Sequence, residues 1–516
     1  MYLYHYNLGL LSSEVLAIHA NRPALRYSEK TYSYGDLSCL VDKLAAMLTG
    51  KGLVKGDVIA IGHNKQPMSY ALMLASLRLG IPYMCIDVAS PLNRNQRIMA
   101  AGGAALLFID DPTFQPLMLE LARVHGCPLC ILVEEDLPRI SDEEHSAQLE
   151  LARQVDGACI AYIMFTSGST GIPKGVAVTH QNILHFVSWG TNRFRISPCD
   201  NFANLSPMYF DNSVFDFYVG LFSGASLTPI PRKILNEPYD LVAYVGQMEC
   251  TVWFSVPSLL MYLSTMKAMN PVSLPTLRSI VFGGEGYPKV ELKKLYALFQ
   301  SQAELVNVYG PTECTCICSA YTMVDSDFDD TQGLPTLGKL NENFDYQILG
   351  EDGDAAETGE LCLIGPNVAS GYFNDTERTS AAFVTITDPC RYSKRMYRTG
   401  DLVREENGML YFVGRKDNQI KHMGYRIELE EIEHVLTRLP YVNQSAVIYK
   451  RTHASHGRLI SFIASTEHPA EDLVLRELRE NLPEYMIPAK IIIMAVLPKN
   501  QNGKVDKQKL QEIDID

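Results

Sequence analysis

Short apolar runs bounded by glycine and proline alternate with stretches of helical period along most of this chain, and this alternation limits the folds open to it. A short apolar run is typical of a buried strand, whereas apolar residues spaced three and four apart predict an amphipathic helix. Strands and helices that alternate in this way favour an α/β fold in which helices cover mixed sheets. The predicted strands are residues 57–62, 83–87, 251–256 and 279–282, and the predicted helices are residues 69–79, 258–269 and 290–299.

The pattern changes after Gly414, where charged residues become dense. Beyond this point the sequence predicts a separate α+β unit. Its predicted elements are a helix at 429–439, strands at 446–450 and 459–464, a helix at 473–482 and a strand at 490–496. We therefore expect a large N-terminal body over residues 1–415 and a small, mobile α+β domain over residues 416–516.

The composition is that of a folded globular protein. Hydrophobic residues make up 47% of the chain and charged residues 20%, which excludes a disordered, collagen-like or coiled-coil chain. Lys and Arg total 45 against 59 Asp and Glu, a formal charge of −14. Because this balance disfavours a broad electrostatic attraction to nucleic acid, any anionic ligand must be bound at a local site.

Nothing in the sequence predicts a membrane span or a secretory signal. No apolar run approaches the length of a membrane helix, and the N-terminus lacks a basic region followed by an apolar stretch. The 12 cysteines are irregularly spaced, which favours reduced thiols over a disulfide framework. We therefore expect a cytoplasmic protein that binds neither membrane nor nucleic acid.

A glycine- and hydroxyl-rich loop follows the apolar run at residues 160–165, which we interpret as a strand. The amides and hydroxyls of such a loop can surround a polyphosphate, and a lysine can add a positive charge. The spacing differs from that of a Walker A loop, and a flexible surface loop is the alternative. The candidate phosphate-binding residues are Thr166, Ser167, Gly168, Ser169, Thr170, Gly171 and Lys174.

This loop and several other motifs make the sequence similar to the adenylate-forming enzymes, which it resembles along most of its length. Within that superfamily it is similar to the amino-acid adenylation domains of nonribosomal peptide synthesis and to D-alanine–carrier-protein ligases. The resemblance extends from about Tyr32 to Lys504. It rests on YSYGDL from Tyr32, LRLGIPYMCID from Leu77, TSGSTGIPKG from Thr166, FDNSVFD from Phe210, NVYGPTE from Asn307, GELCLIGPNVASGYF from Gly359, YRTGDL from Tyr397, GRKDNQIKHMGYRIELEEIE from Gly414, LPEYMIP from Leu482 and NGKVD from Asn502.

The NVYGPTE motif brings an aromatic ring, a hydroxyl and a carboxylate together, as a purine nucleotide and a hard cation require. By itself the motif could also be a turn with a helix N-cap. The resemblance implies that Tyr309 stacks on adenine, that Thr312 contacts the α-phosphate and that Glu313 helps to hold Mg²⁺.

Three further residues would complete the ATP site. The resemblance implies that Asp401 accepts hydrogen bonds from both ribose hydroxyls, although an Asp in a type I turn is the plainer interpretation. Arg415 would reach the ribose or the phosphates. Lys504 would bridge the substrate carboxylate and the α-phosphate during adenylation, in a terminal segment that would otherwise be expected to fray.

The resemblance also implies two half-reactions at one site. The small domain would rotate about Asp417, withdraw Lys504 and bring the Gly424 loop to the adenylate. There the phosphopantetheine thiol of a carrier protein would attack to give a thioester. We expect no fused carrier domain, so that the carrier would be a separate protein.

Asp211 determines the expected class of substrate. In the synthetase branch, the Asp of this FD motif binds the α-ammonium group of an amino acid, which plain acids lack; the alternative is an Asp that caps the next segment. The positions that match the family's side-chain pocket are mostly apolar and favour a compact, uncharged aliphatic side chain such as isoleucine or valine. They are Asn212, Phe215, Phe254, Val281, Gly283, Val308, Cys316 and Ile317.

Two features receive a plainer interpretation, and one position departs from the family pattern. Cys314, Cys316 and Cys318 have a spacing that does not suit zinc, so we expect them to pack in the core or the pocket. His180 and His185 are interpreted as ordinary helix residues. Ser370 stands where the family usually has an arginine.

These observations favour a ligase that activates an amino acid with ATP and Mg²⁺ and transfers it to a separate carrier protein. Such chemistry depends on position and charge compensation rather than on a protein nucleophile. The alternatives within enzymes are an acyl- or aryl-CoA synthetase and a D-alanine–carrier-protein ligase. The alternative outside enzymes is an inactive nucleotide-binding module.

Overall fold

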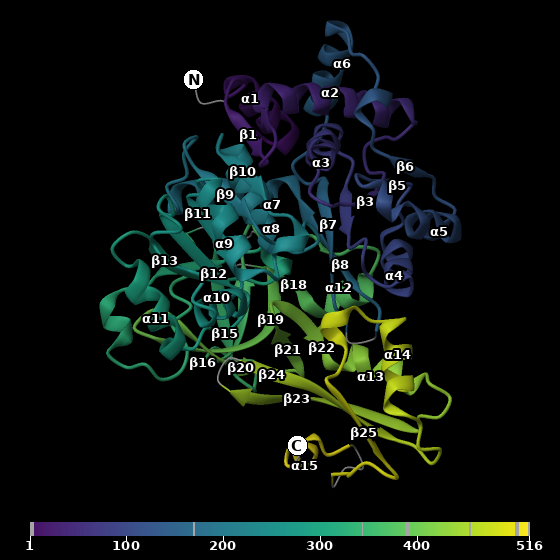
Figure 1. Ribbon diagram of the computed structural model, residues 1–516, viewed down its shortest axis with the longest axis vertical. Helices are drawn as coiled ribbons and strands as arrows, with labels where there is room; N and C mark the ends of the chain where they lie inside the picture. The colour runs from purple at the N-terminus through teal and green to yellow at the C-terminus, as the bar shows by residue number, and fades with distance from the viewer. Residues whose placement is uncertain are drawn as a thin grey trace.

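The computed structural model describes residues 5–168, 171–342, 344–387, 393–453, 456–500 and 505–513. The chain forms a large N-terminal body with a smaller C-terminal domain packed below it in the view of Figure 1. Within the described residues, the large body contains three sheets, and the small domain contains a hairpin and a further sheet.

The first sheet has seven strands in the order β17-β8-β7-β4-β3-β5-β6. Its central strands pair in parallel, whereas β7 and β8 form an antiparallel pair. Every residue of β3, β4 and β5 is buried, because helices cover both faces of these strands. The strands are β3 (Ile59–Gly62), β4 (Tyr83–Ile86), β5 (Leu106–Ile109), β6 (Leu129–Ile131), β7 (Ile160–Thr166), β8 (Lys174–Thr179) and β17 (Gly371–Tyr372).

The second sheet has eight strands in the order β14-β13-β12-β11-β9-β10-β1-β2. Its strands pair in parallel from β13 to β1, and the pairs at both edges are antiparallel. The strands are β1 (Pro23–Arg26), β2 (Thr31–Ser33), β9 (Asn201–Asn204), β10 (Ser226–Pro229), β11 (Val252–Ser255), β12 (Ser279–Gly283), β13 (Glu304–Tyr309) and β14 (Ser319–Thr322).

Helix α3 (Pro67–Leu79) joins the two sheets. Every residue from Met68 to Leu79 is buried, and the Tyr70 hydroxyl donates a hydrogen bond to the Asn204 side chain of β9 at 2.7 Å. The other helices of this part are α1 (Leu8–Ile18), α2 (Tyr34–Gly50), α4 (Leu92–Gly102), α5 (Gln115–His125), α6 (Asp142–Arg153), α7 (His180–Arg193), α8 (Asn212–Val214), α9 (Pro238–Gln247), α10 (Pro257–Thr265) and α11 (Lys289–Phe299).

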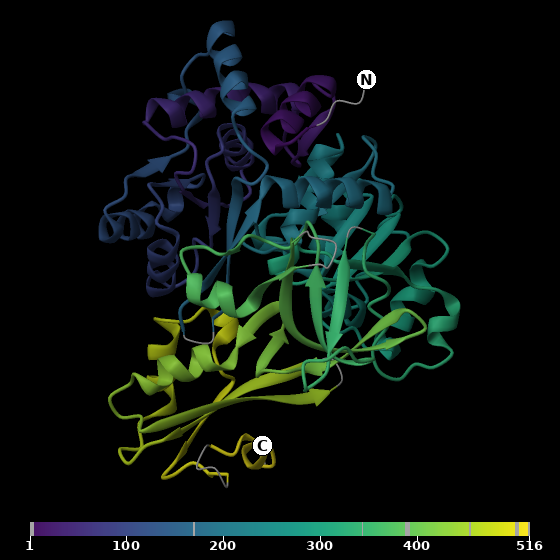
Figure 2. The ribbon, with the colours of Figure 1, turned by 180° about the vertical axis from the view of Figure 1, so that it is seen from behind.

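The third sheet closes the large body. It contains β15 (Asp345–Leu349), β16 (Thr358–Ile364), β18 (Phe383–Thr387), the long β19 (Ser393–Glu406) and β20 (Met409–Arg415), all paired antiparallel. Helix α12 (Thr376–Ala382) precedes β18. From behind, these strands stand between the second sheet and the small domain (Figure 2).

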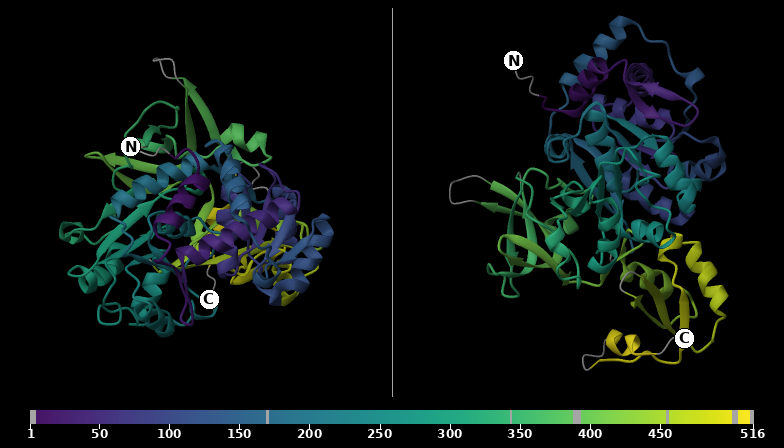
Figure 3. Two further views of the ribbon diagram at one scale, coloured as in Figure 1. Left: turned by 90° about the horizontal axis from the view of Figure 1, so that it is seen from above. Right: turned by 60° about the vertical axis from the view of Figure 1, so that its left-hand side comes forward.

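The small domain has its own apolar core, which includes Ile427, Ile432, Leu436 and Leu478. The hairpin of β21 (Gln419–His422) and β22 (Tyr425–Glu428) opens it and leads directly into α13 (Leu429–Thr437). A second sheet contains β23 (Gln444–His453), β24 (His456–Ala464) and β25 (Lys490–Met494), with α14 (Glu471–Arg479) and α15 (Lys507–Gln511) beside it. The right-hand view of Figure 3 shows this domain as a separate lobe beside the third sheet.

The predicted fold class is confirmed. Each predicted strand and helix overlaps an element of the same type, and the boundaries differ by a few residues. No helix in the described part of the chain is long and apolar enough to cross a membrane. The cysteines of that part are free thiols, as predicted.

Candidate active site

A cleft that is partly open to solvent lies between the large body and the β21–β22 hairpin. It brings together segments that are far apart in the sequence, namely the end of β7, the segment before α8, and the ends of β11 and β13. Predicted site residues that line this cleft are Thr166, Ser167, Asp211, Asn212, Phe254, Val308, Tyr309, Thr312, Cys316, Ile317, Asp401, Arg415 and Gly424.

Asp211 and Thr312 meet inside this cleft although they are 101 positions apart. The Thr312 hydroxyl donates a hydrogen bond to Asp211 Oδ2 at 2.6 Å. Burial raises the pKa of the Asp211 carboxyl above its ordinary value, while the bond from Thr312 opposes this rise. The residue predicted to bind the ammonium group therefore lies next to the residue predicted to contact the α-phosphate.

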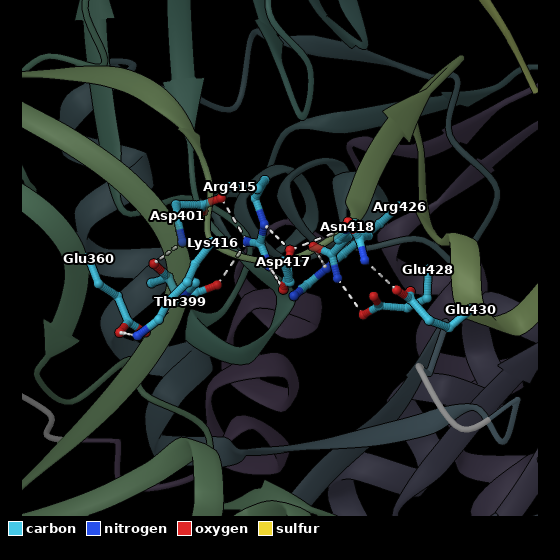
Figure 4. Close-up of polar contacts among 12 residues, drawn as sticks. Glu360, Thr399, Asp401, Arg415, Lys416, Asp417, Asn418, Arg426, Glu428 and Glu430 are labelled. Atoms are coloured by element: carbon cyan, nitrogen blue, oxygen red, sulfur yellow. Dashed lines mark hydrogen bonds and ion pairs between the residues drawn. The ribbon is translucent and has the colours of Figure 1, made fainter. Parts of the chain in front are cut away.

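Tyr309, Asp401 and Arg415 form a second group of contacts. The Tyr309 hydroxyl donates to Asp401 Oδ2 at 2.6 Å and fixes the orientation of its ring. Arg415 Nη1 donates to Asp401 Oδ1 at 2.7 Å, and Arg415 Nη2 lies 2.5 Å from Asp417 Oδ2 (Figure 4). A carboxylate accepts several hydrogen bonds, so Asp401 retains capacity for a ligand hydroxyl.

Glu313 is fully buried between Tyr372 and Arg426. Tyr372 donates to Glu313 Oε1 at 2.9 Å, and Arg426 Nη1 donates to Oε2 at 2.8 Å. Burial alone would raise the pKa of Glu313, but the positive charges of Arg426 and Lys174 lower it from 4.5 to about 2. Glu313 is therefore a permanent carboxylate at neutral pH.

Glu313 is a single carboxylate that could hold a magnesium ion arriving with phosphate. The described residues contain no group of three or more His, Cys, Asp or Glu side chains arranged to hold a metal ion. Mg²⁺ is usually bound through one or two carboxylates together with substrate phosphates and water. Glu313 fits that role, and in this arrangement Arg426 pairs with its carboxylate.

The predicted phosphate-binding loop connects β7 to β8, and the small domain contacts the described part of this loop. The Ser167 hydroxyl donates to the backbone oxygen of Arg426 at 2.6 Å. Lys174 Nζ lies 3.5 Å from Glu428 Oε1, and burial together with the nearby Arg426 lowers the pKa of Lys174. Thr166 Oγ1 is buried and has no hydrogen-bond partner among the described residues, so it can serve a ligand.

Two glycines shape this loop. A Cβ atom at Gly168 would lie 2.1 Å from the backbone oxygen of Ile172, and Gly171 has a φ of +74°. Glycine is therefore the residue that suits both positions. Ser169 and Thr170 lie outside the described residues.

Part of the predicted side-chain pocket lines the cleft, and part lies behind it. Phe215 packs edge-on against Phe254 with ring centroids 5.5 Å apart. Val281 pairs with Phe254 across β11 and β12, and Gly283 pairs with Val308 across β12 and β13. Phe215, Val281 and Gly283 are not among the lining residues, whereas Gly284 and Met164 are.

Gly424 forms the turn of the β21–β22 hairpin at the edge of the cleft. Its φ is +83°, and an added Cβ would lie 2.8 Å from the Val256 side chain, so glycine is favoured here. The Gly424 N–H donates a hydrogen bond to Glu285 Oε1. The loop that we expected at the site is therefore next to it in this arrangement.

Lys504 lies outside the described residues. Lys499 and Val505, on either side of it in the sequence, form an isolated β-bridge with each other. Helix α15, which follows this bridge in the sequence, lies on the side of the small domain that faces away from the large body in Figure 1.

Sequence reasoning missed several residues at the cleft. Arg426 and Tyr425 belong to the GYRIE segment, and Tyr372 belongs to the GYF segment. Both segments lie inside motifs quoted above, and these motifs could have indicated the three residues. Lys421 and Tyr485 also line the cleft and lie inside quoted motifs, whereas Arg94 lines it without a distinctive local pattern.

The features that received a plainer interpretation pack within the fold, and Cys316 also lines the cleft. Cys314, Cys316 and Cys318 are buried, and His180 is a buried residue of α7 whose Nδ1 accepts a hydrogen bond from Leu8 N. The Ser370 hydroxyl donates to the backbone oxygen of Ala177 at 2.9 Å. Ser370 therefore ties the segment before β17 to β8.

The fold, with its cleft between a large body and a small C-terminal domain, defines an adenylate-forming ligase. Residues 13–373 match the AMP-binding enzyme family, and residues 431–504 match the AMP-binding enzyme C-terminal domain. The chain therefore belongs to the AMP-binding enzyme family.

A relative agrees with this assignment, and solved structures share the fold. The chain is 33% identical over 465 residues to a D-alanine--D-alanyl carrier protein ligase of Bacillus thuringiensis, with 88% of this chain and 89% of that protein covered. It resembles the Vibrio cholerae adenylation domain AlmE, solved with glycyl-adenosine-5'-phosphate, with a TM-score of 0.82, 24% identity and coverage of 99% and 98%. A nonribosomal peptide synthetase protein with adenylation and PCP domains gives a TM-score of 0.82 at 24% identity, with coverage of 99% and 85%.

Proposed function

We propose that the protein activates an amino acid with ATP as an aminoacyl adenylate and transfers the aminoacyl group to the phosphopantetheine thiol of a separate carrier protein. The observation behind this proposal is the 2.6 Å contact between Asp211 and Thr312 in a cleft that also contains Tyr309 and Asp401. A carboxylate for an ammonium group, a hydroxyl for a phosphate and an aromatic ring for a purine lie together, as an aminoacyl adenylate requires.

In the first half-reaction, a carboxylate oxygen of the amino acid attacks the α-phosphorus. A new P–O bond forms while the bond to pyrophosphate breaks. The hydroxyl residues of the phosphate-binding loop and Lys174 hold the phosphates, and Lys504 aligns the attacking carboxylate. Mg²⁺ held by Glu313 would supply charge compensation for the phosphates.

In the second half-reaction, the carrier thiol loses its proton to solvent and the thiolate attacks the carbonyl carbon. A C–S bond forms, and the C–O bond to AMP breaks. We assign the boundary between the two domains to residues 415–416 and the hinge to Asp417. The position of Gly424 beside the cleft supports this arrangement for the thioester-forming step.

The side-chain pocket suits a compact, uncharged aliphatic amino acid. Phe254, Val308, Cys316 and Ile317 line it. Among the described residues that line the cleft, Asp401 is the one carboxylate besides Asp211, and Asp401 is assigned to the ribose. Isoleucine and valine fit this character. Alanine, glycine and the D-amino acids belong in the same comparison, because relatives named D-alanyl carrier protein ligases share 33% identity with this chain.

The test is amino-acid-dependent exchange between ATP and pyrophosphate, measured across L- and D-amino acids with fatty and aryl acids alongside. We expect exchange with one or a few aliphatic amino acids. Exchange only with acids that lack an amino group would replace this proposal with an acyl- or aryl-CoA synthetase. Absence of exchange with every acid, in protein that still binds ATP, would favour a nucleotide-binding module without catalysis.

A further inference from the structure

A buried ion pair joins the two domains at the edge of the cleft. Arg94 of α4 lies in the large body and Glu431 of α13 in the small domain. Arg94 Nη1 donates to Glu431 Oε1 at 2.8 Å, and the two side chains are 8% and 0% exposed. Burial so complete is unusual for an ion pair, because both charges lose their hydration.

The pair depends on the arrangement of the domains. Glu431 Oε2 has no hydrogen-bond partner among the described residues, so Arg94 supplies the charge compensation for this carboxylate. Removing either partner would leave a buried charge uncompensated, which is costly. If the small domain moved away, both groups would regain water and this cost would disappear. The intact ion pair therefore stabilises the present arrangement of the domains, whereas loss of one partner destabilises it.

Glu431 is also connected to the part of the small domain that reaches the cleft. Strand β22 ends at Glu428 and α13 begins at Leu429, with no intervening loop. The position of Glu431 therefore constrains both β22 and the turn at Gly424. Arg426 of β22 contacts Glu313, and Gly424 contacts Glu285. On the other side, Arg94 lines the same cleft.

We propose that Arg94 and Glu431 are a positioning pair for the thioester-forming half-reaction. The pair holds the β21–β22 hairpin over the cleft in that step and separates when the small domain turns for adenylation. This inference rests on the proposed function. Neither residue touches the reacting atoms, so both act through the placement of the hairpin.

The first test compares the two half-reactions in Arg94→Met and Glu431→Gln. ATP–pyrophosphate exchange reports adenylation, and transfer of the labelled aminoacyl group to a phosphopantetheine thiol reports thioester formation. We expect exchange within about twofold of wild type and thioester formation slowed roughly 10- to 100-fold. The double variant Arg94→Met/Glu431→Met should lose less than the two single effects combined, because it leaves no unpaired charge.

Matched controls come from α5, where Arg123 and Glu120 are exposed. Arg123→Met and Glu120→Gln should leave both half-reactions unchanged. Thioester formation at the wild-type rate in the single variants would overturn the proposal. An equal loss of exchange and thioester formation would also overturn it, because the pair would then be a general structural contact.

A second measurement needs no substrate and separates this inference from the proposed function. Asn93 Nδ2 donates to Asn481 Oδ1 at 3.2 Å across the same interface, in an exposed position. A disulfide between Asn93→Cys and Asn481→Cys, identified by peptide mass spectrometry, reports the present arrangement, in which the small domain contacts α4. We expect Arg94→Met to slow its formation severalfold. An unchanged rate would overturn the proposal whether or not an amino acid supports exchange.

Discussion

Glu428 Oε1 lies 3.5 Å from the Nζ of Lys174, so the small domain supplies a carboxylate to the lysine of the phosphate-binding loop. On the same strand, Arg426 supplies a positive charge to Glu313 at 2.8 Å. Lys174 and Glu313 are the groups assigned to phosphate and to Mg²⁺. In this arrangement Glu428 and Arg426 of β22 therefore pair with the two side chains that would bind ATP and its Mg²⁺.

Glu428 and the phosphates of ATP would compete for Lys174, so neutralising Glu428 should increase the affinity for ATP. In Glu428→Gln the hydrogen bond from Gln419, 2.6 Å in the wild type, can be kept in part, while the charge opposite Lys174 is lost. We expect the KM for ATP in the exchange reaction to fall roughly threefold, since partly buried ion pairs contribute modest energies. Glu430→Gln, two positions further along, is the control. A higher KM for ATP would contradict the competition.

Asp211→Asn should reduce turnover of the amino acid without disrupting the local hydrogen bond. The amide oxygen can still accept from Thr312, but it carries no charge for an α-ammonium group. We expect kcat/KM for the amino acid to fall about 10- to 100-fold, as the loss of a charge-assisted hydrogen bond implies. Unchanged kinetics would remove Asp211 from the ammonium site.

The pH dependence of amino-acid binding should follow the ionisation of Asp211. Burial raises the pKa of this carboxyl, and the charged form binds the ammonium group. We therefore expect the KM for the amino acid to rise as the pH is lowered towards that raised pKa. In Asp211→Asn the acid limb of the KM profile should be absent, and its persistence would assign the limb to another group.

Glu313 should contribute to stability with a defined pH range. Its pKa falls from 4.5 to about 2 on folding, so the unfolded chain binds the proton first as the pH decreases. The contribution, about 3 kcal/mol, is complete above pH 4.5 and is lost as the pH falls towards 2. Thermal unfolding of wild type and Glu313→Gln should differ most near pH 7, with the difference shrinking in acid. A constant difference would contradict the shift.

Lys504→Ala should abolish adenylate formation and leave the folded domains intact. The ammonium group is assigned to the attacking carboxylate and the α-phosphate, and a methyl side chain can compensate neither charge. Exchange activity should fall by about 100-fold or more, with an unchanged unfolding temperature. Thioester formation from a supplied aminoacyl adenylate should persist. Full exchange activity in the variant would refute the role of Lys504.

Local sequence patterns predicted the elements well because their signals are local. The buried β3, α3 and β4 follow from apolar runs separated by glycine and proline. The full burial of α3 was not predictable in the same way. It depends on contacts of Tyr70 with Asn204, which is 134 positions away.

The candidate site required the family resemblance, since its contacts are long-range. Glu313 and Arg426 are 113 positions apart, and no local pattern links them. The pocket positions show the limit of motif alignment. Gly283 ends β12 and packs against Val308, while its neighbour Gly284, with a φ of +87°, turns the backbone into the cleft lining.

The guanidinium of Arg415 is shared between Asp401 and Asp417. Asp401 is assigned to the nucleotide sugar and Asp417 to the pivot between the domains. A ribose that donates hydrogen bonds to Asp401 would therefore change the electrostatic environment of Asp417 through Arg415. Arg415 thus connects the proposed ribose site directly to the proposed hinge, with no other side chain between them.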